Sequence, residues 1–241
     1  MCVAAIAWRA HPDWLYVAVA NRDEYHERPT APLARWQNGI IAGQDKRAGG
    51  TWLGVSEQAR FALVTNFRVP GYPRPELASR GALVTDWLER AEVAQGSTMN
   101  PFNLLLADAD RARILSNYPG PEEHILAPGI HGLSNGAFAL PWPKARRLCA
   151  DLAGWLAHDA RDLSPLFTAL RNEAPFPEED YEGDGPEPAF SGVFIRNAMY
   201  GTRSSTVVAV SRQGAGAIIE RRFSPDGEET GETALTFDWP G

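Results

Sequence analysis

Short apolar runs separated by turn-forming residues dominate the N-terminal part of the chain. Residues 3–8 (VAAIAW) and 15–20 (LYVAVA) both have strand length, and Pro12 and Asp13 between them favour a turn. This pattern predicts an opening β-hairpin. Further strands are predicted at 40–43, 51–55 and 60–65, with glycine and proline clusters around them. The N-terminal part is therefore predicted to form an antiparallel meander.

Apolar positions change to helical spacing in the middle of the chain. Residues 79–94 and 144–157 each place leucine and tryptophan side chains on one helical face, and Ser79 is the expected N-cap of the first helix. A third helix is expected at 163–171. Further strands are predicted at 102–107, 112–116, 192–196, 205–210, 215–223 and 233–237. This order predicts an α+β fold in which helices cover sheets in layers.

Length and composition fit a single domain. The chain has 241 residues, of which 44% are hydrophobic and 22% charged, and no internal repeat or linker divides it. Residues 1–241 are therefore predicted to form one domain. The only biased segment is 172–190, which is rich in proline and glycine and holds seven acidic side chains but no lysine or arginine. Such a loop is either a functional lid or a mobile, solvated connection.

Charge and cysteine content exclude several classes of function. The net charge is −7, and no basic cluster or basic amphipathic helix offers a site for nucleic acid or an anionic membrane surface. No run approaches the roughly 18 apolar residues of a membrane span, and the start lacks the pattern of a signal peptide. Two cysteines cannot build a disulfide framework, and the five histidines lack metal-ligand spacing. We therefore expect a cytoplasmic protein without nucleic acid or bound metal.

Cys2 has the most distinctive chemistry in the sequence. Methionine aminopeptidases remove Met1 when the second side chain is small, which would leave a cysteine with a free α-amine. An α-amine has a pKa of about 7.7 to 8.0 and can act as the base for a neighbouring thiol. The structural alternative is that Cys2 is only the first residue of a strand. Cys149 lies within a predicted helix, where a buried and inert thiol is expected.

Four polar motifs adjoin apolar runs, where a scaffold presents functional groups to a cleft. These motifs are NRDE at 21–24, Asn66, Ser134-Asn135 and YGTRS at 200–204. Asn66 and Asn135 carry amides that can stabilise an oxyanion. Arg22 or Arg203 can favour a thiolate, and Asp23 can orient an α-amine. Each residue also has a structural alternative, because asparagines form turns and arginine–aspartate pairs are often solvated salt bridges.

Seven short motifs in this order resemble the NRDE family, the family of transport and Golgi organisation protein 2. They are MCVAAIAW at the start, NRDE at 21–24, GGTWLGV at 49–55, TNFR at 65–68, SRG at 79–81, GLSN at 132–135 followed by PWPKA, and YGTRSS at 200–205. The resemblance spans nearly the whole chain. It implies similarity to the N-terminal nucleophile (Ntn) hydrolases of the cholylglycine hydrolase and penicillin V acylase group. Those enzymes have a four-layer αββα sandwich of antiparallel sheets and cleave non-peptide C–N amide bonds.

The resemblance also implies roles for individual residues. Cys2 matches the nucleophile, Asp23 the carboxylate near the α-amine, Asn66 the oxyanion asparagine, Asn135 the second asparagine, and Arg203 the late arginine. In the hydrolase group the early arginine precedes the aspartate by three positions, whereas Arg22 and Asp23 are adjacent. Adjacent side chains of an extended segment point in opposite directions. The family pattern therefore leaves the catalytic role of Arg22 open, and a structural ion pair with Glu24 is its alternative.

Two functions are compatible with these residues. In the first, the Cys2 thiolate attacks a linear or lipid-like amide and water then releases the acyl group, with no cofactor. In the second, the same cleft holds haem or another hydrophobic metabolite without cleaving a bond, because animal members of the family are associated with haem mobilisation. A structural protein with a decayed site is a third possibility. The partner in the first two functions is a small molecule, and the oligomeric state is open.

Overall fold

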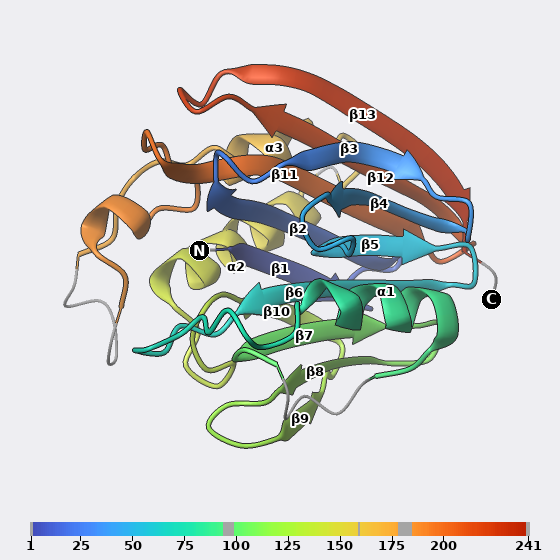
Figure 1. The fold of residues 1–241 in the computed structure, drawn as a ribbon. Helices are drawn as coiled ribbons and strands as arrows, with labels where there is room; N and C mark the ends of the chain where they lie inside the picture. The colour runs from blue at the N-terminus through green and yellow to red at the C-terminus, as the bar shows by residue number, and fades with distance from the viewer. Residues whose placement is uncertain (1, 94–98, 159, 178–184, 240–241) are drawn as a thin grey trace.

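The computed structural model describes residues 2–93, 99–158, 160–177 and 185–239, which form two antiparallel sheets (Figure 1). The six-stranded sheet has the order β10 (Gly129–Leu133), β1 (Val3–Trp8), β2 (Trp14–Tyr25), β11 (Tyr200–Ser211), β12 (Ala215–Phe223) and β13 (Glu229–Asp238). The seven-stranded sheet follows the chain: β3 (Thr30–Arg35), β4 (Ile40–Asp45), β5 (Leu53–Ser56), β6 (Arg60–Asn66), β7 (Phe102–Ala107), β8 (Ala112–Ser116) and β9 (Glu122–Ile125). The predicted hairpin is thus central to the first sheet, and the predicted meander lies in the second.

Helices cover the outer faces of both sheets. The helix α1 (Gly81–Arg90) packs on β4 to β7 of the seven-stranded sheet. The helices α2 (Pro143–Leu156) and α3 (Ser164–Leu170) pack on the six-stranded sheet, α2 against β1 and β10 and α3 against β2 and β11 (Figure 1). The predicted four-layer αββα sandwich of antiparallel sheets is therefore confirmed. None of the described helices combines the length and apolar character that a membrane span needs.

The central strands are apolar on both faces because each lies between two layers. In β1, Ala4, Ile6 and Trp8 face the gap between the sheets, whereas Val3, Ala5 and Ala7 face the helices α2 and α3. The strand therefore reads as a continuous apolar run and not as an alternation of apolar and polar residues. The same division holds in β6, where Phe61 and Leu63 face the other sheet and Ala62 and Val64 face α1.

Residues 192–196 are not the strand that the sequence predicts. Their backbone groups bond outside any ladder, since the Phe194 amide donates to the Asn172 carbonyl at 2.8 Å and the Ile195 amide donates to the Thr202 hydroxyl at 2.9 Å. Val193, Phe194 and Ile195 are nevertheless buried. The apolar run thus reflects a buried coil segment, which a pattern of hydrophobicity alone cannot distinguish from a strand.

Other boundaries also differ from the predicted ones. β2 and β11 stay paired as far as Tyr25 and Tyr200, so the motifs NRDE and YGTRS lie within paired strands and not beyond strand ends. β3, β9 and β10 were not predicted, and β3 contains Pro32 within an irregular stretch of its pairing with β4. α1 begins at Gly81, and the Ser79 hydroxyl accepts a bond from the Gly81 amide at 3.4 Å without being the N-cap. Of the predicted acidic loop 172–190, residues 178–184 lie outside the described residues.

Gly50 and Gly81 bring two segments of the chain into close backbone contact. A Cβ atom on Gly50 would lie 2.7 Å from the Gly81 carbonyl carbon, closer than backbone atoms tolerate. We expect Gly50→Ala to lower the free energy of unfolding by about 1–3 kcal/mol, because neither backbone can yield without shifting α1. Gly154→Ala is the matched control, since nothing lies within 4 Å of its added Cβ on α2 and alanine favours a helix. Urea unfolding that shows equal effects in both variants would contradict this packing.

Candidate active site around Cys2

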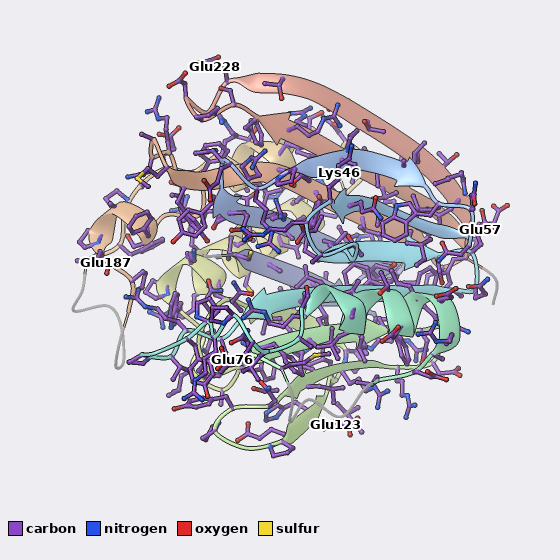
Figure 2. The ribbon with its side chains drawn as sticks, viewed as in Figure 1. Lys46, Glu57, Glu76, Glu123, Glu187 and Glu228 are labelled. Atoms are coloured by element: carbon purple, nitrogen blue, oxygen red, sulfur yellow. The ribbon has the colours of Figure 1, made fainter. Side chains whose placement is uncertain are left out.

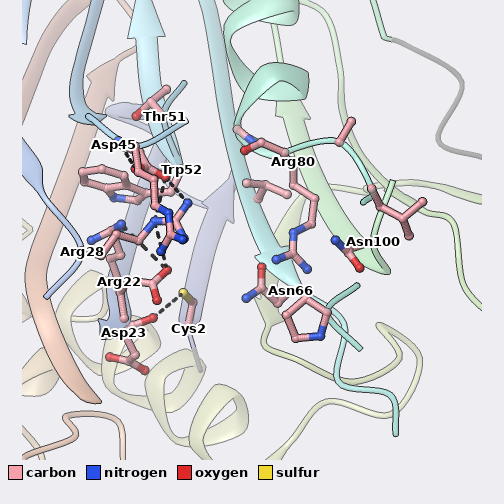
Figure 3. Close-up of a pocket in the computed structure, with 18 of the residues that line it drawn as sticks. Cys2, Arg22, Asp23, Arg28, Asp45, Thr51, Trp52, Asn66, Arg80 and Asn100 are labelled. Atoms are coloured by element: carbon pink, nitrogen blue, oxygen red, sulfur yellow. Dashed lines mark hydrogen bonds and ion pairs between the residues drawn. The ribbon is translucent and has the colours of Figure 1, made fainter. Parts of the chain in front are cut away.

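A cavity of about 400 Å³ opens beside Cys2, between the ends of the two sheets (Figure 3). The six-stranded sheet contributes Cys2, Arg22 and Asp23 to its lining. Trp52, from the loop before β5, lies beside Arg22. The opposite wall contains Asn66, the last residue of β6, and Arg80, the N-cap of α1 (Figure 3). Residues far apart in the sequence therefore meet at one end of the sandwich.

The backbone of Cys2 is held by both neighbours of β1. Because Val3 pairs with Asn21, Cys2 comes opposite Arg22 of β2. The Cys2 carbonyl accepts a hydrogen bond from the Ser134 hydroxyl at 2.9 Å, at the end of β10. Its thiol lies 3.9 Å from the Asp23 carbonyl oxygen. The thiol is thereby held at the sheet edge beside the cavity, half-buried.

Arg22 and Asp23 point to opposite faces of β2, as their adjacency predicts. Arg22 points into the gap between the sheets, on the same side as Cys2, and its guanidinium lies 4.2 Å from the centre of the Trp52 ring. It also donates to the Thr30 hydroxyl at 3.2 Å and lies 4.0 Å from the Glu24 carboxylate. Arg22 therefore lies on the wall of the cavity next to the thiol, where the family pattern alone left its role open.

The Asp23 carboxylate points instead toward the helical layer, where it is completely buried. Its Oδ2 atom lies 3.8 Å from the ammonium nitrogen of Lys144, whose side chain is also fully buried. Its Oδ1 atom accepts a hydrogen bond from the Thr202 hydroxyl at 2.7 Å. Burial raises the pKa of Asp23, and the positive charge of Lys144 opposes that shift. The carboxylate is thus fixed by two partners from α2 and β11.

Asn66 lies on the cavity wall across from the thiol, as Figure 3 shows. Asn135 is buried behind this wall, and its side-chain amide donates to the Asn66 carbonyl at 2.7 Å. Asn135 is not among the residues that line the cavity. Its position supports the backbone of Asn66, so of these two asparagines only Asn66 lines the cavity.

Arg203 also lies outside the cavity lining. The pairing of β2 with β11 slips between Thr202 and Ser204, and this irregularity turns Arg203 away from the regular alternation. Its guanidinium donates to the carbonyls of Tyr25, His26 and Arg28, at 3.0, 3.0 and 3.3 Å. Arg203 therefore fastens the turn after β2. Of the six predicted site residues, the structure brings Cys2, Arg22, Asp23 and Asn66 together and places Asn135 and Arg203 in support.

Sequence reasoning missed Lys144, Trp52 and Arg80, although each lies in a motif that was noted. Lys144 belongs to PWPKA, Trp52 to GGTWLGV and Arg80 to SRG. Arg80 donates to the Pro101 carbonyl at 3.2 Å, and no carboxylate of the described residues lies within ion-pair distance of it. Arg28, in contrast, pairs with Asp45 at 2.6 Å. Among the described residues, the cavity wall across from Cys2 therefore holds a guanidinium group without a carboxylate partner.

The two thiols differ in their surroundings. Burial and the charge of Asp23 raise the pKa of Cys2, and the positive charge of Arg22 opposes that rise. Burial raises the pKa of Cys149 to about 11, and no nearby charge opposes this rise. The Cys149 thiol lies between α2 and Gly132 of β10. Only Cys2 adjoins a cavity with cationic side chains. No cluster of three or more His, Cys, Asp or Glu side chains that could hold a metal occurs among the described residues.

Comparison with known sequences identifies the family. The family model described as Transport and Golgi organisation 2 matches residues 1–225. The Transport and Golgi organization protein 2 homolog of Bos taurus is 31% identical over 239 residues, which cover 85% of each chain. The homolog of Mus musculus is 30% identical over 236 residues, again with 85% of each chain covered. The Drosophila melanogaster protein is 26% identical over 270 residues, with 95% of each chain covered.

Solved structures share the fold at low sequence identity. A mutant conjugated bile acid hydrolase from Clostridium perfringens matches with a TM-score of 0.51 and 10% identity, covering 100% of this chain and 97% of the other. An N-acylethanolamine-hydrolyzing acid amidase ortholog from Caenorhabditis elegans matches with a TM-score of 0.50 and 10% identity, covering 85% and 91%. Both are Ntn hydrolases. The chain therefore belongs to the Transport and Golgi organisation 2 family, the predicted NRDE family, and has the fold of the Ntn hydrolases.

Proposed function

We propose that the protein is an N-terminal cysteine amidohydrolase that cleaves a non-peptide C–N bond. One observation carries the proposal: the Cys2 thiol adjoins a cavity whose far wall holds Asn66 and Arg80, and it lies 3.9 Å from the backbone carbonyl of Asp23, whose carboxylate is buried toward the helices. Two neighbours in fold are named as hydrolases of conjugated bile acids and of N-acylethanolamines. These names support an amide substrate, since an Ntn fold by itself does not fix a reaction.

The proposed reaction begins once Met1 is removed and the α-amine of Cys2 is free. This amine accepts the thiol proton, and the thiolate attacks the amide carbonyl carbon. The side chain of Asn66 donates to the oxyanion, and Arg22 and Arg80 supply positive charge near it. The tetrahedral intermediate collapses with cleavage of the C–N bond, and the leaving amine takes the proton from the α-ammonium group. Water then attacks the thioester with the α-amine as base, which releases the acid and restores the thiol.

The positive charge of the cavity lining indicates which amides it can bind. Besides Arg22 and Arg80, its lining includes Arg28, Arg47 and Arg74. Among the described residues, neither Arg47 nor Arg74 has a carboxylate within ion-pair distance. A linear or lipid-like amide with an anionic group fits such a wall better than a neutral one does. No step of this reaction requires a cofactor.

Trapping of the thioester tests the proposal directly. The protein, made without an N-terminal tag, is incubated with N-acyl amino acids, N-acylethanolamines and neutral fatty amides, quenched in acid and digested for peptide mass analysis. We expect the mass of one acyl group on the peptide that contains Cys2 and none on the peptide that contains Cys149. Stoichiometric binding of an amide, of haem or of another hydrophobic metabolite, without adduct or product, would contradict hydrolysis and support a binding protein.

A further inference from the structure

Lys144 occupies an unusual place for a lysine. The chain contains only two lysines, and Lys46 lies exposed on the loop after β4 (Figure 2), as lysines usually do. The side chain of Lys144 is instead fully buried. It also lies in the first turn of α2, where the helix dipole disfavours a positive charge. A charge kept at such a cost in solvation requires a specific partner.

That partner is the Asp23 carboxylate, and the surrounding contacts fix its orientation. Lys144 faces Oδ2 at 3.8 Å, and the Thr202 hydroxyl bonds to Oδ1 at 2.7 Å. Thr202 is itself held, because its hydroxyl accepts the Ile195 amide at 2.9 Å. The backbone carbonyl of Asp23 accepts the Tyr200 hydroxyl at 2.9 Å and lies 3.9 Å from the Cys2 thiol. The carboxylate therefore cannot rotate freely, and it is held beside the start of β1.

We propose that Lys144 is a positioning residue, which shares the Asp23 carboxylate with the α-amine that Met1 removal frees on Cys2. This role rests on the proposed function. Two cations then share one buried carboxylate, so the charge of Lys144 makes protonation of both the α-amine and the thiol less favourable. More of the amine is neutral at neutral pH as a result, and the amine can act as the base. Lys144 itself touches neither the substrate nor the reacting atoms.

Several groups besides Lys144 act on this pair. The titratable or charged groups that face Cys2 and Asp23 from the surrounding elements are Arg22 on β2, Tyr200 on β11 and Arg80 at the start of α1. These groups are all still present when Lys144 is replaced. A shift in the pH midpoint of Cys2 alkylation therefore reports the loss of the Lys144 charge. Lys144→Met keeps the length of the side chain and removes the charge, and Lys46→Met makes the same change on the surface.

The test is the pH dependence of Cys2 alkylation by limiting iodoacetamide, followed by peptide mass analysis without any amide substrate. We expect the midpoint to move to higher pH by on the order of one unit in Lys144→Met and to stay unchanged in Lys46→Met. An unchanged midpoint in Lys144→Met, with Cys2 still labelled, would overturn the role of Lys144 and leave the proposed function intact. Cys2 that is never labelled in preference to Cys149, even in the unmodified protein, would overturn both.

A second measurement needs no substitution of Lys144. Because the chain has only two lysines, protein labelled with ¹³C-lysine gives two εCH₂ signals in an NMR spectrum, one of which Lys46→Met removes. We expect the Lys144 signal to show a step at the pH where alkylation of Cys2 has its midpoint, and the Lys46 signal to show none. A Lys144 signal without such a step would contradict a shared carboxylate even if Lys144→Met fails to fold.

Discussion

Asp23→Asn is expected to lower the free energy of unfolding by about 3–5 kcal/mol near pH 7, because it removes the carboxylate that pairs with the buried Lys144 ammonium group. Asparagine is close to aspartate in size and can still accept the Thr202 hydroxyl, so packing changes little. Burial lowers the pKa of Lys144, and replacing Asp23 removes the largest influence that opposes this shift. The unfolded chain then binds more protons than the folded one, so the stability of the variant should rise with pH above 7. Urea unfolding at several pH values measures both effects.

Two controls separate the buried pair from ordinary surface charge. Glu123→Gln removes a carboxylate that pairs with Arg113 at 2.9 Å on the surface, and its effect should stay below about 1 kcal/mol. The double variant Asp23→Asn/Lys144→Met removes both buried charges and should recover most of the lost stability. An Asp23→Asn protein as stable as Glu123→Gln, or a double variant no better than the single one, would show that the pair is not charged in the native protein.

Cys2→Ala is expected to abolish amide turnover, with a loss of at least about 10³-fold on a substrate found by thioester trapping. The change removes the nucleophile from a half-buried position at the end of β1, so the midpoint of urea unfolding should change little. Cys149→Ala is the matched control. This thiol lies on α2 with a pKa raised to about 11 and no contact with the cavity, so turnover should persist.

The outcomes of these two variants distinguish the candidate functions. Loss of turnover in Cys2→Ala alone supports the nucleophile. Equal loss in both variants, or turnover that survives Cys2→Ala, would contradict it. If Cys2→Ala loses turnover and also has a lower midpoint of urea unfolding, turnover is measured again with Cys2→Ser, which keeps a hydrogen-bonding group near the Asp23 carbonyl.

Much of the fold could be predicted because apolar runs map onto layers. A run such as residues 3–8 is buried on both faces, so its strand is visible from hydrophobicity alone. The same pattern misleads at 192–196, where the apolar residues are buried without strand pairing. β3 was not predicted because Pro32 weakens the strand pattern and because only one of its residues, Leu33, is buried at this edge of the sheet.

The candidate site could be predicted only in part from the sequence. The alternation of β2 predicts that Arg22 and Asp23 face opposite sides, and this follows from local geometry. The positions of Asn135 and Arg203 depend on contacts with distant backbone carbonyls and on a pairing irregularity, which no local pattern encodes. Lys144 could not be assigned because its role requires knowing that α2 begins over the end of β2. A lysine in the first turn of a predicted helix, against the dipole, was the only available signal.

On removal of Met1, Cys2 is expected to become an activated N-terminal nucleophile. The most direct test is intact and peptide mass analysis of protein made without an N-terminal tag, after brief labelling with limiting iodoacetamide near pH 6. An ordinary thiol with a pKa of about 8.5 reacts little at that pH. We predict that Met1 is absent and that the label is confined to Cys2, with any molecules that retain Met1 unlabelled. Retention of Met1 throughout, or labelling of Cys149 as fast as Cys2, would show that Cys2 is not an activated N-terminal nucleophile.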